Sequence, residues 1–289
     1  RTPCAEARKQ QGGSDEQAQQ AQEGLGVGRE GGVDVDRQAV SLPKPYYSDG
    51  DVTLYHGKCE DVLPSIAAES IGGVFTSPPY NLGDMSGGYA NLAGGYATYE
   101  DQMPADAYAE WQGEVLRQCW RAISPSGAIF YNHKPRVQNG VLWTPLALNP
   151  GLPLRQVLIW SRSSGFNWSE THLVPMHEWI LFFAKPGFRM TKATSSLGDV
   201  WHVNILQGHA RPDHPAPFPL ALAAKGMQVM AESAGSLPIL DPFAGSGQTL
   251  LAARQAGMKS VGIEFDEAYC ELIASRLSQG VLDFGEEPA

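Results

Sequence analysis

Two stretches of the sequence place reactive or ligand-binding residue types directly after short apolar runs. The first is "GGVFTSPPY" (72–80), in which Ser77 precedes two prolines and Tyr80 follows them. Proline lacks a backbone N–H and fixes φ, so this segment can neither continue a strand nor begin an ordinary helical turn. The pattern therefore predicts a rigid hook that holds one hydroxyl and one aromatic ring at the end of a buried strand.

The second stretch is "PILDPFAGSGQTLLAARQAG" (238–257), where an apolar run leads into Asp241, a glycine turn and a helical pattern. Gly245 and Gly247 allow a ligand to approach the backbone, and a helix N-terminus favours polar or anionic groups. The stretch lacks the third glycine of a dinucleotide fingerprint and the lysine of a P-loop. Glu264 follows Gly245 by 19 residues at the end of the next apolar run. There a carboxylate can accept both hydroxyls of a ribose, so these features favour a nucleoside ligand without phosphates.

Short apolar runs recur along the chain and alternate with helical patterns. Continuous apolar runs bounded by Gly and Pro are typical of strands buried on both faces. Helical spacing predicts helices over 105–123 and 266–279, the second with Asp266 as N-cap and Gly280 after its end. We expect seven strands, at 52–56, 72–76, 127–132, 155–160, 178–184, 237–241 and 259–265. The alternation predicts an α/β fold with one mostly parallel, seven-stranded sheet.

A single domain is expected over residues 46–284. Residues 1–45 are rich in Gln, Gly, Glu and Ala and cannot bury enough apolar surface to offset their ordering entropy, so we expect a disordered tail. The segment 86–102, rich in Gly and Tyr, is a candidate lid. Residues 186–213 form a candidate target-recognition region, which is too short for a large recognition domain.

The net charge of −10 hides a basic segment. Residues 130–215 carry eight Lys and Arg against four Asp and Glu, a net charge of +4, so the rest of the chain carries −14. This excess is either a chance local feature or a phosphate-facing surface on an acidic protein. Under the second interpretation, the candidate phosphate contacts are Lys134, Arg136, Arg189 and Lys192.

The sequence argues against a membrane span, a disulfide frame and a metal site. No apolar run reaches the roughly 18 residues of a membrane span. The four cysteines form no CxxC pair, which favours reduced thiols in a cytoplasmic protein. His172 and His177 have no third ligand at metal spacing. His133, beside Lys134 and Arg136, is expected to meet phosphate or solvent.

Four motifs in a fixed order carry a family resemblance. "TSPPY" (76–80), "HPAPFP" (214–219), "DPFAGSGQT" (241–249) and "GIEFD" (262–266) together resemble the amino-methylating DNA methyltransferases, which use S-adenosylmethionine. The hook precedes the cofactor loop, as in the circularly permuted beta group of that family. The resemblance extends from "LYHGKCEDVLP" (54–64) to "SRLSQG" (275–280). It implies a Rossmann-like, S-adenosylmethionine-dependent methyltransferase domain that acts on double-stranded DNA.

The resemblance implies that the hook, Ser77, Pro78, Pro79 and Tyr80, is catalytic. An exocyclic amino nitrogen is a poor nucleophile because its lone pair is delocalised into the base. Ser77 Oγ and the Pro78 carbonyl would accept its two N–H groups, and the prolines would keep both acceptors in place. Tyr80 would stack on the flipped base, an interaction worth roughly 1–3 kcal/mol that any aromatic face could supply. Asn81 is either a further base contact or a turn residue.

The cofactor contacts also follow from the resemblance. Asp241 and the turn after it would hold the methionine part of S-adenosylmethionine, and Glu264 would hold the ribose. The chain departs from the family pattern at Lys58, where Asp is frequent beside the adenine contact, and at Gln248, where Thr is common. The complete expected set is Gly57, Phe218, Asp241, Pro242, Phe243, Gly245, Ser246, Gly247, Thr249 and Glu264.

The most specific expectation is methyl transfer to the amino group of cytosine, at N4. Family members with Ser before Pro-Pro tend to modify cytosine N4, whereas Asp or Asn there accompanies adenine N6. A serine hydroxyl can both accept from the amino group and donate to a ring nitrogen of either base. The alternatives are an adenine N6 methyltransferase, a DNA-binding relative without catalysis, and a small-molecule or RNA methyltransferase. A cognate restriction endonuclease, and the choice between monomer and homodimer, stay open.

Overall fold

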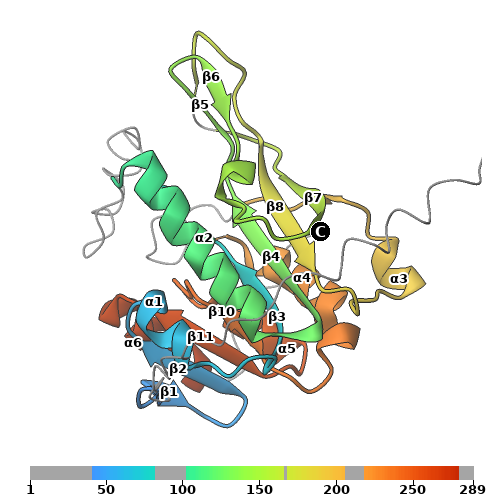
Figure 1. Ribbon diagram of the computed structural model, residues 1–289. Helices are drawn as coiled ribbons and strands as arrows, with labels where there is room; N and C mark the ends of the chain where they lie inside the picture. Colours follow the sequence, from blue (N-terminus) through green and yellow to red (C-terminus); the bar gives the residue numbers. More distant parts are fainter. Residues whose placement is uncertain (1–40, 82–101, 166–167, 206–217, 280–289) are drawn as a thin grey trace, which may run out of the picture. The chain divides into compact units, whose positions relative to one another are not determined.

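The computed structural model describes residues 41–81, 102–165, 168–205 and 218–279 (Figure 1). Most of the expected tail, nearly all of the candidate lid, the end of the candidate recognition region and Gly280 lie outside these residues. Within them, no helix is both long enough and apolar enough to cross a lipid bilayer.

A nine-stranded sheet forms the centre of the described chain, in the order β1-β2-β11-β10-β3-β4-β8-β7-β9. Its strands are β1 (Tyr47–Ser48), β2 (Val52–His56), β3 (Ile71–Thr76), β4 (Ile123–His133), β7 (Leu154–Ser161), β8 (His177–Ala184), β9 (Val200–His202), β10 (Ile239–Asp241) and β11 (Ser260–Glu264). The strands from β2 across to β4 are parallel, and β8 runs antiparallel between β4 and β7. The predicted mostly parallel α/β sheet is confirmed with all seven expected strands, and the short β1 and β9 extend its two edges.

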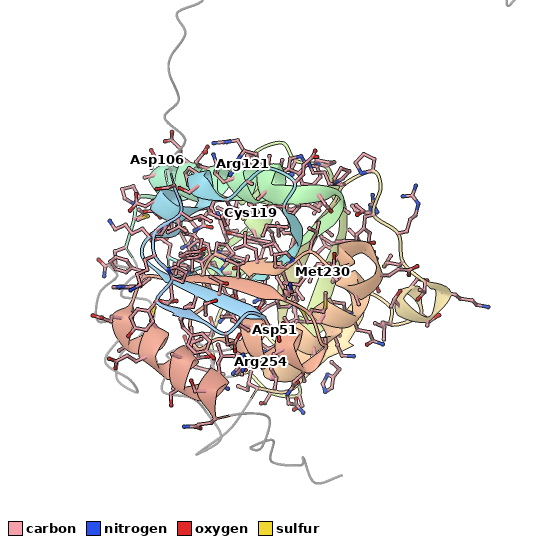
Figure 2. The ribbon with its side chains drawn as sticks, turned by 90° about the horizontal axis from the view of Figure 1, so that it is seen from below. Asp51, Asp106, Cys119, Arg121, Met230 and Arg254 are labelled. Carbon is pink, nitrogen blue, oxygen red and sulfur yellow. The ribbon has the colours of Figure 1, made fainter. Side chains whose placement is uncertain are left out.

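Helices cover both faces of this sheet. They are α1 (Cys59–Val62), η1 (Leu63–Ser65), α2 (Ala105–Ala122), η3 (Pro145–Leu148), α3 (Lys192–Ser195), α4 (Leu220–Ala234), α5 (Gln248–Gln255) and α6 (Glu267–Ser278). α1 and α2 pack on one face against Val74 and Ile129, whereas α4 and α5 pack on the other against Phe75 and Phe130. Successive strand residues point to opposite faces, so continuous apolar runs are what a sheet covered on both faces requires. Figure 2 shows the helices on the two faces of the sheet, with Cys119 labelled on α2 and Arg254 on α5.

Two glycines let α4 approach β3 more closely than side chains would permit. A Cβ atom at Gly226 of α4 would lie 2.3 Å from the Phe75 ring, and one at Gly73 of β3 would lie 2.5 Å from Met230 Sδ. Both distances are far below a van der Waals contact. The glycines of "GGVFT" therefore serve packing, and they fix the strand that carries the hook against its covering helix.

The chain leaves β10 and β3 in opposite directions along the sheet. β10 leads through α5 to β11 on one side, and β3 leads through α2 to β4 on the other, with the two helices on opposite faces. In an open α/β sheet, the ligand crevice lies at the carboxyl ends of strands where the connections diverge in this way. Thr76 ends β3 and Asp241 ends β10, so both sequence motifs begin at this point.

Candidate active site and cofactor site

The two motifs are joined by a hydrogen bond. Thr76 Oγ1 donates to Asp241 Oδ1 over 2.7 Å, and both side chains are buried. The parallel register of β10 and β3, in which Leu240 lies opposite Val74, sets this contact. The hook and the glycine turn therefore leave the sheet from neighbouring strands, with their first residues locked together.

Side chains from α2 and from a hairpin hold the hook. Tyr108 of α2 donates its hydroxyl to the Pro79 carbonyl over 2.7 Å. Arg136 donates from Nη1 to the Tyr80 carbonyl over 2.6 Å. Arg136 begins the hairpin of β5 (Arg136–Gln138) and β6 (Val141–Trp143), which continues from β4. Among the described residues, no hydrogen bond reaches the Pro78 carbonyl, so the hook is anchored while this acceptor stays available.

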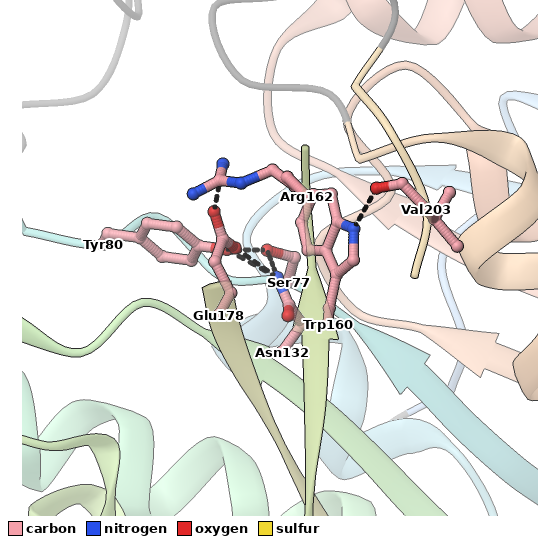
Figure 3. Close-up of polar contacts among 7 residues, drawn as sticks. All are labelled: Ser77, Tyr80, Asn132, Trp160, Arg162, Glu178 and Val203. Atoms are coloured by element: carbon pink, nitrogen blue, oxygen red, sulfur yellow. Dashed lines mark hydrogen bonds and ion pairs between the residues drawn. The ribbon is translucent and has the colours of Figure 1, made fainter. Parts of the chain in front are cut away.

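Four polar groups converge beneath the hook (Figure 3). Ser77 Oγ and Tyr80 Oη are 2.8 Å apart, and Tyr80 donates to Glu178 Oε2 over 2.9 Å. Asn132 Nδ2 lies 2.7 Å from Tyr80 Oη, 3.0 Å from Glu178 Oε2 and 3.3 Å from Ser77 Oγ. The hydroxyl and the ring that the sequence placed at the strand end are therefore held by residues of β4 and β8.

The Glu178 carboxylate is buried and has a cationic partner. Arg162 Nη1 lies 3.2 Å from Glu178 Oε1, and the two side chains are 10% and 8% exposed. The Arg162 guanidinium also lies over the Trp160 ring, at 5.4 Å from the ring centroid, and Trp160 Nε1 donates to the Val203 carbonyl. A buried carboxylate needs such pairing because an isolated charge is costly in a protein interior.

His133 does not meet phosphate or solvent, so that expectation is wrong. The side chain is fully buried, and its Nε2 lies 2.9 Å from the Tyr108 hydroxyl. Burial lowers the pKa of His133 to about 3, so the imidazole is neutral at physiological pH. Its ring packs against Tyr80 with centroids 4.6 Å apart. His133 therefore supports the aromatic ring of the hook from within the core.

Asp241 is placed to hold a polar ligand at the glycine turn. Its Oδ1 accepts from Thr76 and from the Phe243 N–H, whereas Oδ2 is buried without a hydrogen-bond partner among the described residues. Burial raises the pKa of Asp241 to about 6, against the opposing effect of the nearby Thr249 and Thr76 hydroxyls and of the Phe243 N–H; the Thr249 hydroxyl itself donates to the Phe75 carbonyl. A buried carboxylate oxygen without a donor is the kind of group that a ligand ammonium or N–H can satisfy.

Glu264 is oriented by the backbone at the end of β11. Its Oε2 accepts from the Gly245 N–H over 2.7 Å, and its Oε1 accepts from the Asp266 N–H over 2.9 Å. Burial raises the pKa of Glu264 to about 7. The Gly57 N–H donates to the Glu264 carbonyl, so the structure brings together Gly57, Gly245 and Glu264 as the sequence suggested.

Other expected cofactor residues have structural contacts. Phe218 is buried in the core, with its ring centroid 5.6 Å from that of Phe75. Thr249 donates to the Phe75 carbonyl, which attaches α5 to β3. Gly247 has φ +84° and precedes α5, and a Cβ atom there would lie 2.9 Å from Ile273. The contacts of Thr249 and Gly247 shape the turn, whereas Phe218 packs in the core. Pro242 and Ser246 are also buried in the turn, and Phe243 lies edge-on to Trp111.

The basic residues proposed from the sequence do not share one surface. Lys134 is half-buried near Glu178 at the carboxyl edge of β4. Arg136 stacks on Trp143, with its guanidinium 4.3 Å from the ring centroid. Arg189, in contrast, is bonded through its backbone to Ser233 at the end of α4, near the opposite edge of the sheet. Lys192 follows it at the start of α3.

Asn81 has well-defined contacts within the chain. The residue is buried with φ +54°, and its side-chain amide exchanges two hydrogen bonds with the backbone of Met103, at 2.6 and 2.8 Å. These bonds join the chain on either side of residues 82–101. The turn interpretation of Asn81 therefore has direct structural support, and its contact with a base stays a prediction.

Comparison with known proteins decides the family. The model of the DNA methylase family, which comprises N6 and N4 methyltransferases, matches residues 71–275. This chain belongs to the DNA methylase family. The Type II methyltransferase M.ScaI of Streptomyces caespitosus is 29% identical over 277 residues, covering 82% of this chain and 84% of the relative. The DNA adenine methyltransferase YhdJ of Escherichia coli is 24% identical over an alignment that covers 78% of this chain and 82% of that protein.

Solved structures support the same fold. The cytosine-N4-specific PvuII DNA methyltransferase superimposes with a TM-score of 0.65 at 19% identity, covering 83% of this chain and 90% of that one. TTHA0409 of Thermus thermophilus, solved in complex with S-adenosyl-L-methionine, superimposes with a TM-score of 0.57 at 24% identity, covering 80% and 96%. The Rossmann-like methyltransferase fold expected from the motifs is confirmed.

Sequence reasoning missed three polar residues of this methylase site: Asn132, Arg162 and Glu178. A signal was present, because "EWILFFA" opens with an acidic residue that a buried strand cannot leave unpaired. What the sequence did not show is that β8 runs antiparallel to β4, with Trp179 opposite His133. That pairing brings the first residues of β8 beside the last residues of β4.

We predict that Asp241→Asn stabilises the ligand-free methylase above pH 7. The folded pKa of about 6 lies above the ordinary value of 3.8, so stability from this group is fully present below pH 3.8, falls as pH rises from 3.8 to 6, and is lost above 6. Asn can accept the same hydrogen bonds without the buried charge. Urea unfolding at pH 8 should show a gain of about 1–3 kcal/mol that falls to roughly half at pH 5 and vanishes below the unfolded pKa of 3.8.

Asp51→Asn, at an exposed position, is the matched control and should show no such pH-dependent gain. A difference between the Asp241 variant and wild type that is the same at both pH values would show that Asp241 is not buried as a charge.

Proposed function

We propose that this DNA methylase transfers the methyl group of S-adenosylmethionine to the N4 amino group of cytosine in double-stranded DNA. The observation that carries the proposal is the buried bond from Thr76 to Asp241. It joins the ends of two adjacent strands, and we assign the hook after one to the target amino group and the glycine turn after the other to the cofactor. Each motif alone is compatible with other functions, whereas their direct contact provides a methyl donor site beside a nucleophile site.

The residues of the turn fit S-adenosylmethionine, which supplies an electrophilic methyl group on a sulfonium centre. Asp241 Oδ2 is a buried acceptor without a donor among the described residues, suited to the ammonium of the methionine part. The Glu264 carboxylate is fixed by two backbone N–H groups, which leaves lone pairs for the ribose hydroxyls. The likeness to a protein solved with this cofactor agrees with the assignment.

The hook supplies the base side of the reaction. Ser77 Oγ and the Pro78 carbonyl accept the two N–H groups of the target amino nitrogen, which draws its lone pair out of conjugation with the ring. The new N–C bond forms as the C–S bond of the sulfonium breaks, giving the methylated base, S-adenosylhomocysteine and one proton. The contribution of the protein is preorganisation, because Tyr108 and Arg136 fix the hook before the base arrives.

Ser77 is the feature that favours cytosine N4, through the pattern of Ser before Pro-Pro in relatives of that specificity. Adenine N6 is the second candidate, and the likeness to a DNA adenine methyltransferase favours it. Sequencing DNA from cells that express the chain, with detection of modified bases, tests both candidates. Cytosine N4 methylation at one recurrent sequence is expected. Adenine N6 methylation would reverse the choice of base, and unmodified DNA would refute the activity.

We predict that Glu264→Ala weakens S-adenosylmethionine binding by roughly 1–3 kcal/mol, because the ribose hydroxyls lose an acceptor. The pKa of about 7 adds a pH dependence. Wild-type affinity should rise as pH increases through 7, as the carboxyl group becomes a full acceptor, and the variant should lose this rise. Titration calorimetry at pH 6, 7 and 8 measures both effects.

Glu267→Ala, on the exposed first turn of α6, is the control and should bind like wild type. Equal affinity of the Glu264 variant and wild type at pH 8 would remove the ribose assignment but not the methyltransferase assignment.

We predict that Lys134, and not Arg189 or Lys192, contributes to DNA affinity. Lys134 lies at the carboxyl edge beside the hook, whereas Arg189 lies near the opposite edge. Lys134→Met should weaken binding to all sequences and reduce the slope of log K against log salt by about one unit. Fluorescence anisotropy at several salt concentrations measures the slope. Equal loss of slope in Arg189→Met would show that DNA also contacts the other edge.

A further inference from the structure

The positions of the Ser77 and Tyr80 hydroxyl protons follow from Glu178, because a carboxylate accepts hydrogen bonds but cannot donate them. An ionised carboxylate has no proton to give, so Tyr80 must donate its hydroxyl to Glu178 Oε2, at 2.9 Å. The opposite arrangement, with the Tyr80 proton turned towards Ser77, would leave two oxygen lone pairs facing each other at that distance. Glu178 therefore fixes the direction of the Tyr80 hydroxyl.

The direction of Tyr80 in turn fixes the direction of Ser77. Ser77 Oγ and Tyr80 Oη are 2.8 Å apart, and one of them must donate. Because the Tyr80 proton is committed to Glu178, the proton of this bond comes from Ser77. The Tyr80 oxygen then accepts from Ser77 and from Asn132 Nδ2, which lies 2.7 Å away.

Asn132 is oriented by the same carboxylate. Its Nδ2 has two protons and three acceptors within reach, Tyr80 Oη at 2.7 Å, Glu178 Oε2 at 3.0 Å and Ser77 Oγ at 3.3 Å. With the amide reversed, the Asn132 oxygen would face the Glu178 oxygen. The longest contact is the one to Ser77, so Ser77 Oγ retains accepting capacity.

We propose that Glu178 is a positioning residue that holds the Ser77 hydroxyl as a hydrogen-bond acceptor towards the target amino group, acting through Tyr80 and Asn132. The proposal rests on the proposed function, since it concerns the acceptor that the amino group meets. Arg162 gives the buried Glu178 carboxylate its counter-charge. The Ser77 proton points into the protein, so Ser77 does not donate to a ring nitrogen of the base.

The proposal changes what is expected of Tyr80. If its ring were only a stacking platform, any aromatic residue would serve in its place. If its hydroxyl connects Glu178 to Ser77, Tyr80→Phe leaves Ser77 without the acceptor that fixes its proton. The ring and its packing on His133 are unchanged in this variant, so the loss reports on the hydroxyl alone.

Single-turnover methylation by purified full-length protein tests the proposal, with the variants Glu178→Gln, Tyr80→Phe and the double variant. Each single variant should slow methyl transfer by about 10- to 100-fold, the scale expected for a misdirected catalytic group. Affinities for S-adenosylmethionine and DNA should match wild type. The double variant should be no slower than the slower single variant, because both changes break the same chain of hydrogen bonds.

Glu114→Gln is the matched control, since Glu114 is exposed on α2 in an ion pair with Arg117, and it should be as fast as wild type. Tyr80→Phe keeps the test decisive if Glu178→Gln does not fold. A wild-type rate in Tyr80→Phe, or losses that multiply in the double variant, would overturn the proposal. Absence of methylation by the wild-type protein would instead overturn the proposed function.

Discussion

The site depends on the buried hydrogen bond between Thr76 and Asp241. A carboxylate at the end of a buried strand is tolerated because the Thr76 hydroxyl and the Phe243 N–H both donate to it. The same bond fixes the separation between the hook and the glycine turn, because each motif begins at one of its partners. Because both motifs begin at the ends of neighbouring strands, no long loop is needed to bring them together. Under the proposed function, the distance between methyl donor and acceptor is therefore set by the register of β3 and β10.

The antiparallel strand β8 adds a second constraint from the other side of the hook. A parallel strand would place its polar carboxyl end at this edge, whereas β8 presents its amino end and so brings Glu178 beside Asn132. The carboxylate organises the donors around it, and Arg162 balances its charge. The hook is then held through its backbone by Tyr108 and Arg136 and through its side chains by Glu178.

The sequence was informative where local patterns decide the outcome. Apolar runs located the seven main strands, and the prolines and glycines located the two motifs at strand ends. The basic segment was misleading, because Lys134 and Arg189 lie at opposite edges of the sheet although both belong to one stretch of chain. His133 was assigned wrongly and Glu178 was missed, because their surroundings come from pairing between distant segments. Local periodicity carries no information on which strand lies beside which, or in which direction.

Buried polar atoms without partners are informative about this edge of the sheet. Asn132 Oδ1, Arg162 Nε and Asp241 Oδ2 all lack a hydrogen-bond partner among the described residues. Each such atom costs about 1–3 kcal/mol, and native proteins bury few of them. A fold selected for stability alone would replace these side chains with apolar ones. These three atoms lie beside the hook and the turn, where a bound ligand could supply the missing hydrogen bonds. These atoms lower the stability of the folded chain, and they remain able to bind the polar groups of a ligand.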